Sequence, residues 1–374
     1  MDELKGAQAE RDALLGLWAV PGVGPKGLQS LRARLAQGFG NLLEVPTGDW
    51  VPDSGLPRNV RERLLGVPTL QRVATRVQER AKSGQMSILF PGDAGFPEGL
   101  QTIPSAPPLL FMRGHTGPPH RRLAMVGSRK PEQGFLRLAR QLAFEVAREG
   151  VLVVSGAAEG VDRACHDGAT QAGRPTWAFL GSALDTLDPA QAALEPSVLG
   201  SGGAYYSELP PGVRASTTTF PRRNRLIAGA SDAVLILRAG EASGSLHTAL
   251  AALEQDRPLL ALPGDIDNAT ALGCNSLIWT GKARLCRGPA DIFATLQMQP
   301  GAQVVLDTRA AADWAAALSA EARQAYEALT RAPRSFDEVR GACQLDSAAL
   351  TSALCELELT GLAVQHPGRR YERI

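Results

Sequence analysis

The stretch that decides the fold reads Leu123-Ala124-Met125-Val126-Gly127-Ser128-Arg129, a short apolar run that ends in glycine, serine and arginine. Apolar residues at four-residue spacing follow, which is typical of one face of a helix, and Gly150 is placed to end that helix. A second apolar run, Val151-Leu152-Val153-Val154, comes directly afterwards. The order of strand, helix and strand predicts parallel strands joined by a covering helix.

The same rhythm continues along the chain. Further apolar runs lie at residues 176–180, 233–237 and 258–262. Continuous apolar strands that alternate with helices indicate a mostly parallel sheet with helices on both faces. We therefore expect an α/β fold with a doubly wound, Rossmann-like sheet.

Four segments are expected. Residues 1–75 are expected to form a small helical domain, and residues 76–300 the Rossmann-like domain. Residues 301–319 are rich in alanine and are interpreted as a linker, and residues 320–374 form a compact last domain. A length of 374 residues allows this many units.

The composition excludes several classes of protein. The chain is 44% hydrophobic and 21% charged, with a net charge of +1, as in ordinary globular proteins. No apolar run approaches the ~20 residues of a membrane span, and the N-terminus lacks the pattern of a signal peptide. The five cysteines are widely spaced without a Cys-x-x-Cys pair, so neither a zinc site nor a disulfide framework is expected. A reducing cytoplasm fits this pattern best.

An arginine tract stands out against the neutral background. Phe220-Pro221-Arg222-Arg223-Asn224-Arg225 lies in a stretch, from Leu209 to Ser231, that contains no acidic residue. Planar guanidinium groups suit bidentate binding of phosphate. The alternative is that carboxylates distant in sequence pair with these arginines.

Three loops rich in glycine and serine follow predicted strands. They are Gly127-Ser128-Arg129, the loop from Ser155-Gly156 to Gly160, and Ser243-Gly244-Ser245. Ligands of doubly wound sheets bind outside the carboxyl ends of the strands, where small residues let a phosphate approach the backbone. The loops contain neither a Gly-x-Gly-x-x-Gly fingerprint nor a P-loop, so no dinucleotide and no other cofactor is expected.

Asp162 and His166 lie four residues apart on the helix expected after Gly160, so they share one face. They are a conceivable acid–base pair. We favour structural roles, with Asp162 compensating the helix N-terminus and His166 packed, because no nucleophile lies nearby in the sequence. No catalytic residue is therefore expected.

The first segment resembles a helix-hairpin-helix. Val20-Pro21-Gly22-Val23-Gly24-Pro25-Lys26 provides a tight turn before a helix N-terminus, which can hold a phosphate. A plain turn between packed helices is the alternative. The last segment resembles a winged helix, with a capping-box pattern at Ser335 and Glu338. With eight Lys/Arg and ten Asp/Glu from residue 301 onward, that segment carries about −2, so partner binding is as well supported as DNA reading.

Residues from about 88 to 286 resemble the DNA processing protein A (DprA, also called Smf) family. The motifs that carry the resemblance occur in family order: Val126-Gly127-Ser128-Arg129, Ser155-Gly156, Gly160 with Asp162 and His166, Ser207-Glu208, the run from Phe220 to Gly229, Ser243-Gly244-Ser245, Thr248-Ala249, Pro263-Gly264, and Gly273 with Asn275, Leu277 and Ile278.

The resemblance implies an extended Rossmann-like domain that binds single-stranded DNA and forms homodimers. It also implies a recombination mediator that loads the RecA recombinase onto incoming single strands in natural transformation, without catalysis. By matching position, the residues that contact the DNA backbone are Arg129, Arg222, Arg223, Asn224 and Arg225. Those that shape the pocket are Gly127, Ser128, Ser155, Gly156, Gly160, Ser243, Gly244 and Ser245. Arg163, which follows Gly160 closely, is expected to add a positive charge.

The chain departs from the family pattern after its third predicted strand. Where the family has a Tyr-Pro pair, this chain has Asp188-Pro189, so an aromatic that could stack on a base is missing. Phe220 is the nearest aromatic candidate, and a core position is expected for it. Phosphate binding is therefore better supported than base stacking.

Two other functions remain open. Gly244-Ser245-Leu246-His247-Thr248, with Glu254 further on, faintly resembles the catalytic motif of nucleotide phosphoribohydrolases, although the paired glycines and nearby glutamate of that motif are absent. The chain could instead be a protein scaffold that uses its two end domains.

Overall fold

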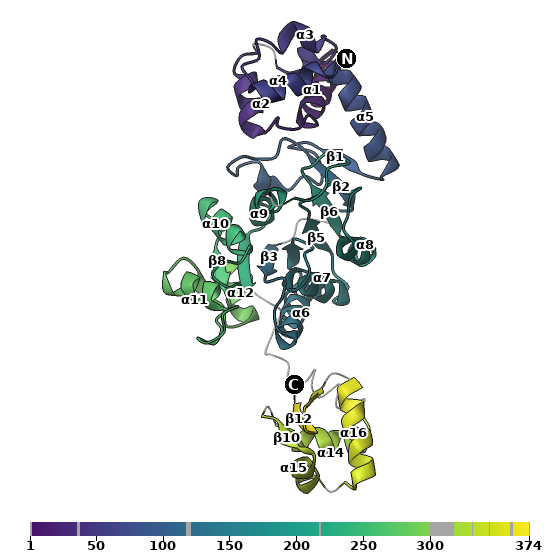
Figure 1. The fold of residues 1–374 in the computed structure, drawn as a ribbon, viewed down its shortest axis with the longest axis vertical. Helices are drawn as coiled ribbons and strands as arrows, with labels where there is room; N and C mark the ends of the chain where they lie inside the picture. Colours follow the sequence, from purple (N-terminus) through teal and green to yellow (C-terminus); the bar gives the residue numbers. More distant parts are fainter. Residues whose placement is uncertain are drawn as a thin grey trace. The chain divides into compact units, whose positions relative to one another are not determined.

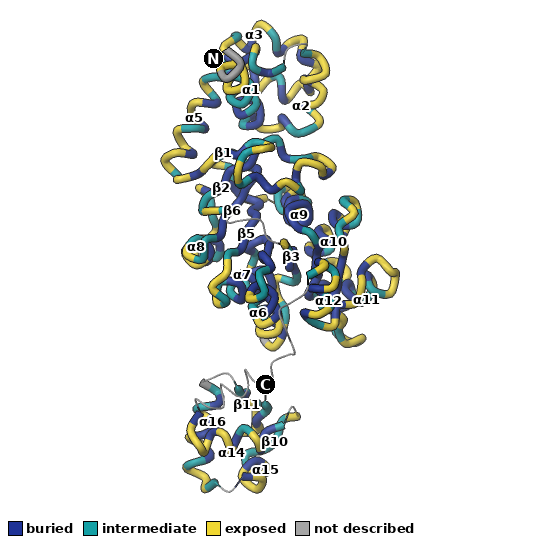
Figure 2. The backbone as a smooth tube through the Cα atoms, turned by 180° about the vertical axis from the view of Figure 1, so that it is seen from behind, coloured by how far each residue is buried: buried dark blue, intermediate teal, exposed yellow. Residues whose placement is uncertain are grey.

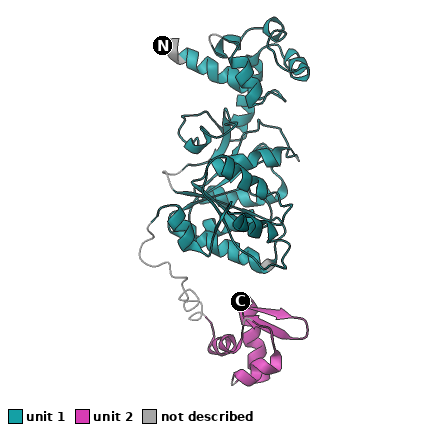
Figure 3. Ribbon diagram, turned by 90° about the vertical axis from the view of Figure 1, so that its left-hand side faces the viewer, with its two compact units in different colours: residues 1–301 teal, residues 302–374 magenta. Residues whose placement is uncertain are grey.

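The computed structural model describes residues 2–35, 38–116, 121–216, 218–298, 318–330, 332–343, 345–359 and 362–373. They belong to two compact units, residues 1–301 and residues 302–374 (Figure 3). Of the expected linker at 301–319, only Leu318 and Ser319 are among the described residues.

The larger unit is built on one sheet. Among the described residues it has nine strands, in the order β1-β2-β6-β5-β4-β3-β7-β8-β9 (Figure 1). The strands are β1 (Ser87–Leu89), β2 (Leu110–Gly114), β3 (Arg122–Gly127), β4 (Leu152–Ser155), β5 (Thr176–Phe179), β6 (Ala204–Ser207), β7 (Ala233–Arg238), β8 (Leu259–Ala261) and β9 (Arg284–Leu285). β2 pairs antiparallel with both β1 and β6. All other neighbouring strands of the sheet pair parallel. The expected mostly parallel sheet is confirmed.

The order of the strands creates a switch point. From β3 the chain adds β4, β5 and β6 on one side, and it then returns to place β7 on the other side of β3. β3 and β7 are neighbours, and the loops that follow them leave the same edge of the sheet in opposite directions. Such a point is the usual ligand site of a doubly wound sheet.

Helices cover both faces of the sheet. They are α6 (Gln133–Arg148), α7 (Val161–Gln171), α8 (Pro189–Gly200), α9 (Thr219–Gly229), α10 (Leu246–Glu254), α11 (Leu272–Trp279) and α12 (Pro289–Thr295), with the short 3-10 helix η2 (Glu98–Leu100). Ala124 and Val126 of β3 share a core with residues of α9 and α10. Side chains alternate along a strand, so Leu123 and Met125 face the other side, where α7 packs on β3 and β4. Figure 2 shows the central strands as buried.

The helical first segment packs on the sheet within the same unit. It contains α1 (Asp2–Trp18), α2 (Pro25–Arg32), η1 (Gly40–Leu42), α3 (Thr47–Trp50), α4 (Arg58–Leu65) and α5 (Leu70–Ser83). Its buried residues, such as Leu17, share one core with Phe111 and Tyr205 of the sheet. The Trp18 Nε1 donates a hydrogen bond of 2.6 Å to the Glu208 carbonyl. The helices and the sheet thus form a single packed body.

The expected hairpin lies between α1 and α2. Gly22 has φ +96°, a left-handed conformation that favours glycine, and Val20 and Val23 on either side are buried. α2 begins after Gly24, whose position provides no side-chain cap. The turn is therefore both tight and packed.

The smaller unit has the order expected for a winged helix. It contains α14 (Ala320–Ala328), β10 (Arg334–Ser335), α15 (Phe336–Ala342), α16 (Ser347–Leu359), β11 (Ala363–His366) and β12 (Arg370–Arg373). Its strands pair in the order β10-β12-β11. The capping box is confirmed, because Ser335 Oγ accepts from the Glu338 N–H and the Glu338 carboxylate accepts from the Ser335 N–H.

Candidate functional site

A pocket of about 470 Å³ opens at the switch point, and we call it the switch-point pocket. It is lined by Val126, Gly127, Ser128, Arg129, Lys130, Ala158, Asp162, Phe220, Pro221, Arg223, Asn224, Ile227, Ser243, Gly244, Ser245, His247 and Thr248. The structure thus brings together the loop after β3, the arginine tract on α9 and the loop after β7. The Ser128 N–H donates to the Arg238 carbonyl at 2.8 Å, which joins the ends of β3 and β7.

Asp162 organises the floor of this pocket. Its buried carboxylate accepts hydrogen bonds from the N–H of Gly127 (3.3 Å) and the N–H of Gly156 (3.2 Å). Burial raises the pKa of this carboxyl, whereas the charge of Arg223 and the backbone donors oppose the rise. One side chain on α7 therefore holds the loops after β3 and β4 at a fixed separation.

Arg223 is buried rather than presented to solvent. The residue is only 4% exposed, and its Nη1 donates to the Phe179 carbonyl at 2.8 Å. Burial lowers the pKa of this guanidinium to about 10, and the charge of Asp162 counteracts that effect. A Cβ on Gly156 would lie 1.7 Å from Arg223 Nη1, so only glycine leaves room for the guanidinium.

Arg225 also has a protein partner, because it forms an ion pair with the nearly buried Glu208. Asn224 points its Nδ2 at the Gly244 carbonyl, at 3.2 Å, and so ties α9 to the loop after β7. For these two arginines the structure therefore supports the alternative that carboxylates distant in sequence pair with the tract. Buried carboxylates balance Arg223 and Arg225, since α9 packs its inner face against the sheet. Direct contact of these two arginines with DNA remains a prediction.

The exposed cations of the site are Arg129, Lys130 and Arg222. Within the described chain, none of the three forms an ion pair with a carboxylate. The Arg129 guanidinium lies 4.7 Å from the centre of the Phe220 ring, which holds the cation at the mouth of the pocket. Arg222 does not line the switch-point pocket. Lys130 does line it, although the sequence did not predict Lys130 as a site residue.

Phe220 is half-buried and lines the pocket, so the expectation of a core position for it is wrong. It lies near the start of α9, where one side of its ring meets Arg129 instead of the sheet. His247, exposed on α10, also lines the pocket. The sequence placed it in the segment that faintly resembles the phosphoribohydrolase motif and did not predict it as a DNA-binding residue.

Ser155, Gly156, Gly160 and Arg163 stand behind the pocket rather than in its lining. Ser155 Oγ donates to the Met125 carbonyl at 2.6 Å and so cross-links β4 to β3. Gly160 has φ +87°, and a Cβ there would lie 2.5 Å from the Ser128 carbonyl oxygen. These residues fix the spacing of the loops.

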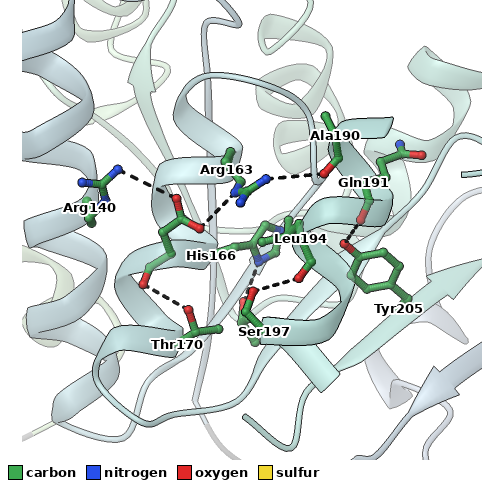
Figure 4. Close-up of polar contacts among 11 residues, drawn as sticks. Arg140, Arg163, His166, Thr170, Ala190, Gln191, Leu194, Ser197 and Tyr205 are labelled. Carbon is green, nitrogen blue, oxygen red and sulfur yellow. Dashed lines mark hydrogen bonds and ion pairs between the residues drawn. The ribbon is translucent and has the colours of Figure 1, made fainter. Parts of the chain in front are cut away.

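Arg163 links two helices. Its Nε donates to Asp167 at 3.0 Å, and its Nη1 donates to the Ala190 carbonyl at 3.4 Å (Figure 4). Asp167 also pairs with Arg140, at 3.8 Å, so one carboxylate serves two arginines, and the positive charge that Arg163 adds to the site stays a prediction. Arg163 also ties α7 to the first turn of α8.

His166 is packed, as we favoured from the sequence. It is fully buried, and its Nδ1 lies 2.8 Å from the Thr176 hydroxyl, which itself donates to the Val153 carbonyl. Burial lowers the pKa of His166 to about 3, so the ring is neutral at physiological pH. Asp162 faces backbone donors and not this ring, so the two do not form an acid–base pair.

In the part of the chain that the structure describes, no three His, Cys, Asp or Glu side chains converge as metal ligands would. Among the described helices, none combines the length and apolar composition that crossing a bilayer requires.

Comparison with known proteins places this site in context. The family model described as DNA recombination-mediator protein A matches residues 87–297, and the model described as DprA winged helix domain matches residues 309–369. Protein Smf of Synechocystis sp. is 29% identical to the chain over 408 aligned residues, covering 98% of the chain and 100% of that protein.

Solved structures of DNA processing protein A share the fold. The X-ray structure of DNA processing protein A from Streptococcus pneumoniae has a TM-score of 0.60 and 27% identity, covering 78% of this chain and 96% of that one. Another is DNA processing protein A from Helicobacter pylori, reported for its single-stranded DNA binding mode. It has a TM-score of 0.50 and 27% identity, covering 57% of this chain and 96% of that one.

Proposed function

Because the chain belongs to the DNA recombination-mediator protein A family, also called DprA or Smf, we propose that it binds single-stranded DNA at the switch-point pocket. The observation that carries the proposal is the pair of exposed cations, Arg129 and Lys130, beside an accessible Phe220 ring. Cations that meet the backbone and an aromatic on which bases stack are the usual components of a single-strand site. Gly244, where a Cβ would meet no atom within 4 Å, leaves its loop open to close approach by the strand.

The binding is expected to be largely electrostatic and indifferent to ATP or metal. Fluorescence anisotropy with single- and double-stranded oligonucleotides over a salt series tests it. For Arg129→Ala we expect about tenfold weaker binding, and a salt slope of log K that is smaller by about 0.7, since one phosphate contact is lost. Phe220→Ala should weaken binding by about 1–3 kcal/mol through lost stacking.

The matched control is Arg148→Ala, which removes one cation at the C-terminal end of α6, away from the loops after β3 and β7. It should leave both affinity and salt slope nearly unchanged. If Arg129→Ala and Arg148→Ala bind oligonucleotides alike, the assignment of the strand to this pocket fails.

We further propose that the bound strand is handed to RecA during natural transformation and that the chain catalyses no reaction. The family membership supports a mediator role. The expected result is faster assembly of RecA filaments on single-stranded DNA when the chain is present, measured by light scattering. An unchanged assembly rate, with DNA binding intact, would exclude the loading role.

The geometry favours binding over a phosphoribohydrolase activity. Asp162 is the carboxylate in the described lining of the pocket, and it is engaged by two backbone N–H groups. Glu254 lies at the far end of α10 from Gly244, so it is not placed to act with the loop. Release of free base from a nucleoside monophosphate would nevertheless establish the enzyme.

A homodimer is the state we propose in solution. Trp279, 90% exposed, and Leu285, 45% exposed, flank the turn that leads into β9 at one edge of the sheet. An edge strand of the described sheet beside exposed apolar groups suits an isologous contact with a second copy. Trp279→Arg should yield a monomer in light scattering after gel filtration, whereas Leu65→Arg, at a position of α4 that is 47% exposed, should not. A dimer that survives Trp279→Arg would place the interface elsewhere.

A further inference from the structure

A second pocket, of about 350 Å³, adjoins the switch-point pocket, and we call it the side pocket. Its lining consists of Arg129, Ala158, Glu159, Asp188, Pro189, Ala190, Gln191 and Phe220. Arg129, Ala158 and Phe220 line both pockets. The stacked pair of Arg129 and Phe220 therefore stands at the boundary between them.

The two pockets differ in charge. Arg129 and Lys130 are the exposed cations of the switch-point pocket, whose lining carboxylate is buried. The side pocket instead presents two carboxylates, Glu159 and Asp188. Neither belongs to an ion pair within the described chain. The switch-point pocket thus suits a phosphate, and the side pocket repels one.

The first turn of α8 reinforces this difference. Asp188 Oδ1 accepts from the Gln191 N–H at 2.8 Å, and Pro189 has no N–H to offer. The helix N-terminus is therefore largely satisfied by its own capping box and retains little capacity for an anion. Asp188 Oδ2 is not engaged by any described residue, so it remains available as an acceptor.

Gln191 supplies a donor in the same pocket. It is only 2% exposed, and its Oε1 accepts from the Asp188 N–H at 3.1 Å. No described residue accepts a hydrogen bond from its Nε2. Figure 4 shows the carboxamide pointing away from the Tyr205 hydroxyl, which hydrogen-bonds the Gln191 carbonyl at 2.9 Å. The Nε2 is not among the buried side-chain atoms that lack a partner, so it reaches the solvent of the side pocket and is free to donate to a ligand acceptor there.

The walls of the side pocket are held in place from behind. Arg163 donates to the Ala190 carbonyl, and Tyr205 donates to the Gln191 carbonyl. Contacts from α7 and β6 thus fix the first turn of α8. A recognition site requires this kind of support, because donors and acceptors must be held in a set geometry.

We infer that the side pocket is a nucleobase subsite that selects bases with an exocyclic amino group over thymine. The inference rests on the proposed single-strand function. The carboxylates accept from an amino group, the Gln191 amide donates to a neighbouring ring nitrogen or carbonyl, and Phe220 provides a flat face. Cytosine and adenine present an amino donor beside an acceptor. Thymine has no amino group, and its single N3–H donor is flanked by two carbonyl oxygens that the carboxylates repel.

Anisotropy competition with oligo-dC, oligo-dA and oligo-dT of equal length tests the inference. The full chain should bind oligo-dC and oligo-dA about tenfold more tightly than oligo-dT. The double variant Asp188→Asn with Glu159→Gln should bring the ratio close to one. Asn is itself a good N-cap, so α8 keeps its start. Glu79→Gln, an exposed acid on α5, should leave the ratio as in the parent chain.

The quantity to compare is the ratio of the affinities for oligo-dC or oligo-dA to the affinity for oligo-dT. The affinities themselves are less informative, because removing two carboxylates strengthens binding of any strand. Equal affinity for the three oligonucleotides overturns the base subsite while the proposed function stands. A preference that persists in the double variant also overturns it, since another site must then read the base. Failure to bind any single strand refutes the proposed function itself.

Discussion

Replacing Asp162 by asparagine tests whether one buried carboxylate holds the site together. The carboxylate accepts two backbone N–H groups, from Gly127 and Gly156, and lies close enough to Arg223 to affect its pKa. Asparagine has the same shape, but it offers one oxygen and turns an NH₂ group toward the other donor. It also leaves the buried guanidinium without its counter-charge.

The magnitude follows from these contacts. Attraction between unit charges just beyond ion-pair distance is worth about 3 kcal/mol at an effective dielectric constant of about 20. An unsatisfied backbone N–H costs about 1–3 kcal/mol more. Removing the charge also removes its desolvation cost, which the raised pKa of Asp162 reflects. We therefore expect the free energy of unfolding to fall by about 3 kcal/mol.

Urea unfolding followed by circular dichroism measures this loss. Arg223→Met should be similarly costly, and the double variant should lose less than the two single losses combined, because no uncompensated charge is then buried. Glu79→Gln, exposed on α5, should stay within about 0.5 kcal/mol of the parent. A loss below about 1 kcal/mol for Asp162→Asn, or additive losses in the double variant, would refute the organising role of this carboxylate.

Three further substitutions probe the same region. Gly156→Ala places a Cβ 1.7 Å from the buried Arg223 Nη1, so we expect a clear drop in the urea midpoint; an unchanged midpoint would contradict the buried guanidinium. Gly160 has φ +87°, and a Cβ there would lie 2.5 Å from the loop after β3, so Gly160→Ala should displace that loop and weaken single-strand binding in anisotropy titrations. Equal affinity would mean that Gly160 does not hold the loop in place. Burial lowers the pKa of His166 to about 3, so its contribution to stability is present above pH 6.5 and is lost as the pH falls toward 3. His166→Gln should flatten the fall in melting temperature over that range, and an equally steep fall in the variant would count against the buried neutral ring.

Sequence patterns predicted the inner strands of the sheet and missed others. β3, β4, β5, β7 and β8 were found because each is a continuous apolar run. β6 was missed, although Tyr205 and Tyr206 are fully buried in it. Glycines precede the two tyrosines, as they would in a loop. The tyrosine hydroxyls find hydrogen-bond partners only in the folded chain, so the sequence gives no sign that they are buried.

The sequence predicted where the candidate site lies in the fold, but it did not predict the partners of the individual side chains. Parallel strands bring the loops at their carboxyl ends to one edge, so spacing alone predicted that Gly127 and Gly244 would meet. The partners of Arg223 and Arg225 depend on packing between distant segments, and no local pattern identifies Phe179 or Glu208 as those partners. Phe220 was misplaced for the same reason, because an aromatic next to a helix start can face either the core or a pocket.

The shared core of the first helices and the sheet bears on how the chain can be divided. The family match begins at residue 87, yet Leu109, Phe111 and Tyr205 are covered by residues that precede it. The Trp18 indole is also bound to the carbonyl of Glu208, whose side chain pairs with Arg225. A protein shortened to start at residue 87 would expose this apolar surface and loosen the support of α9. The boundary of sequence similarity and the boundary of independent folding therefore fall at different places in this chain.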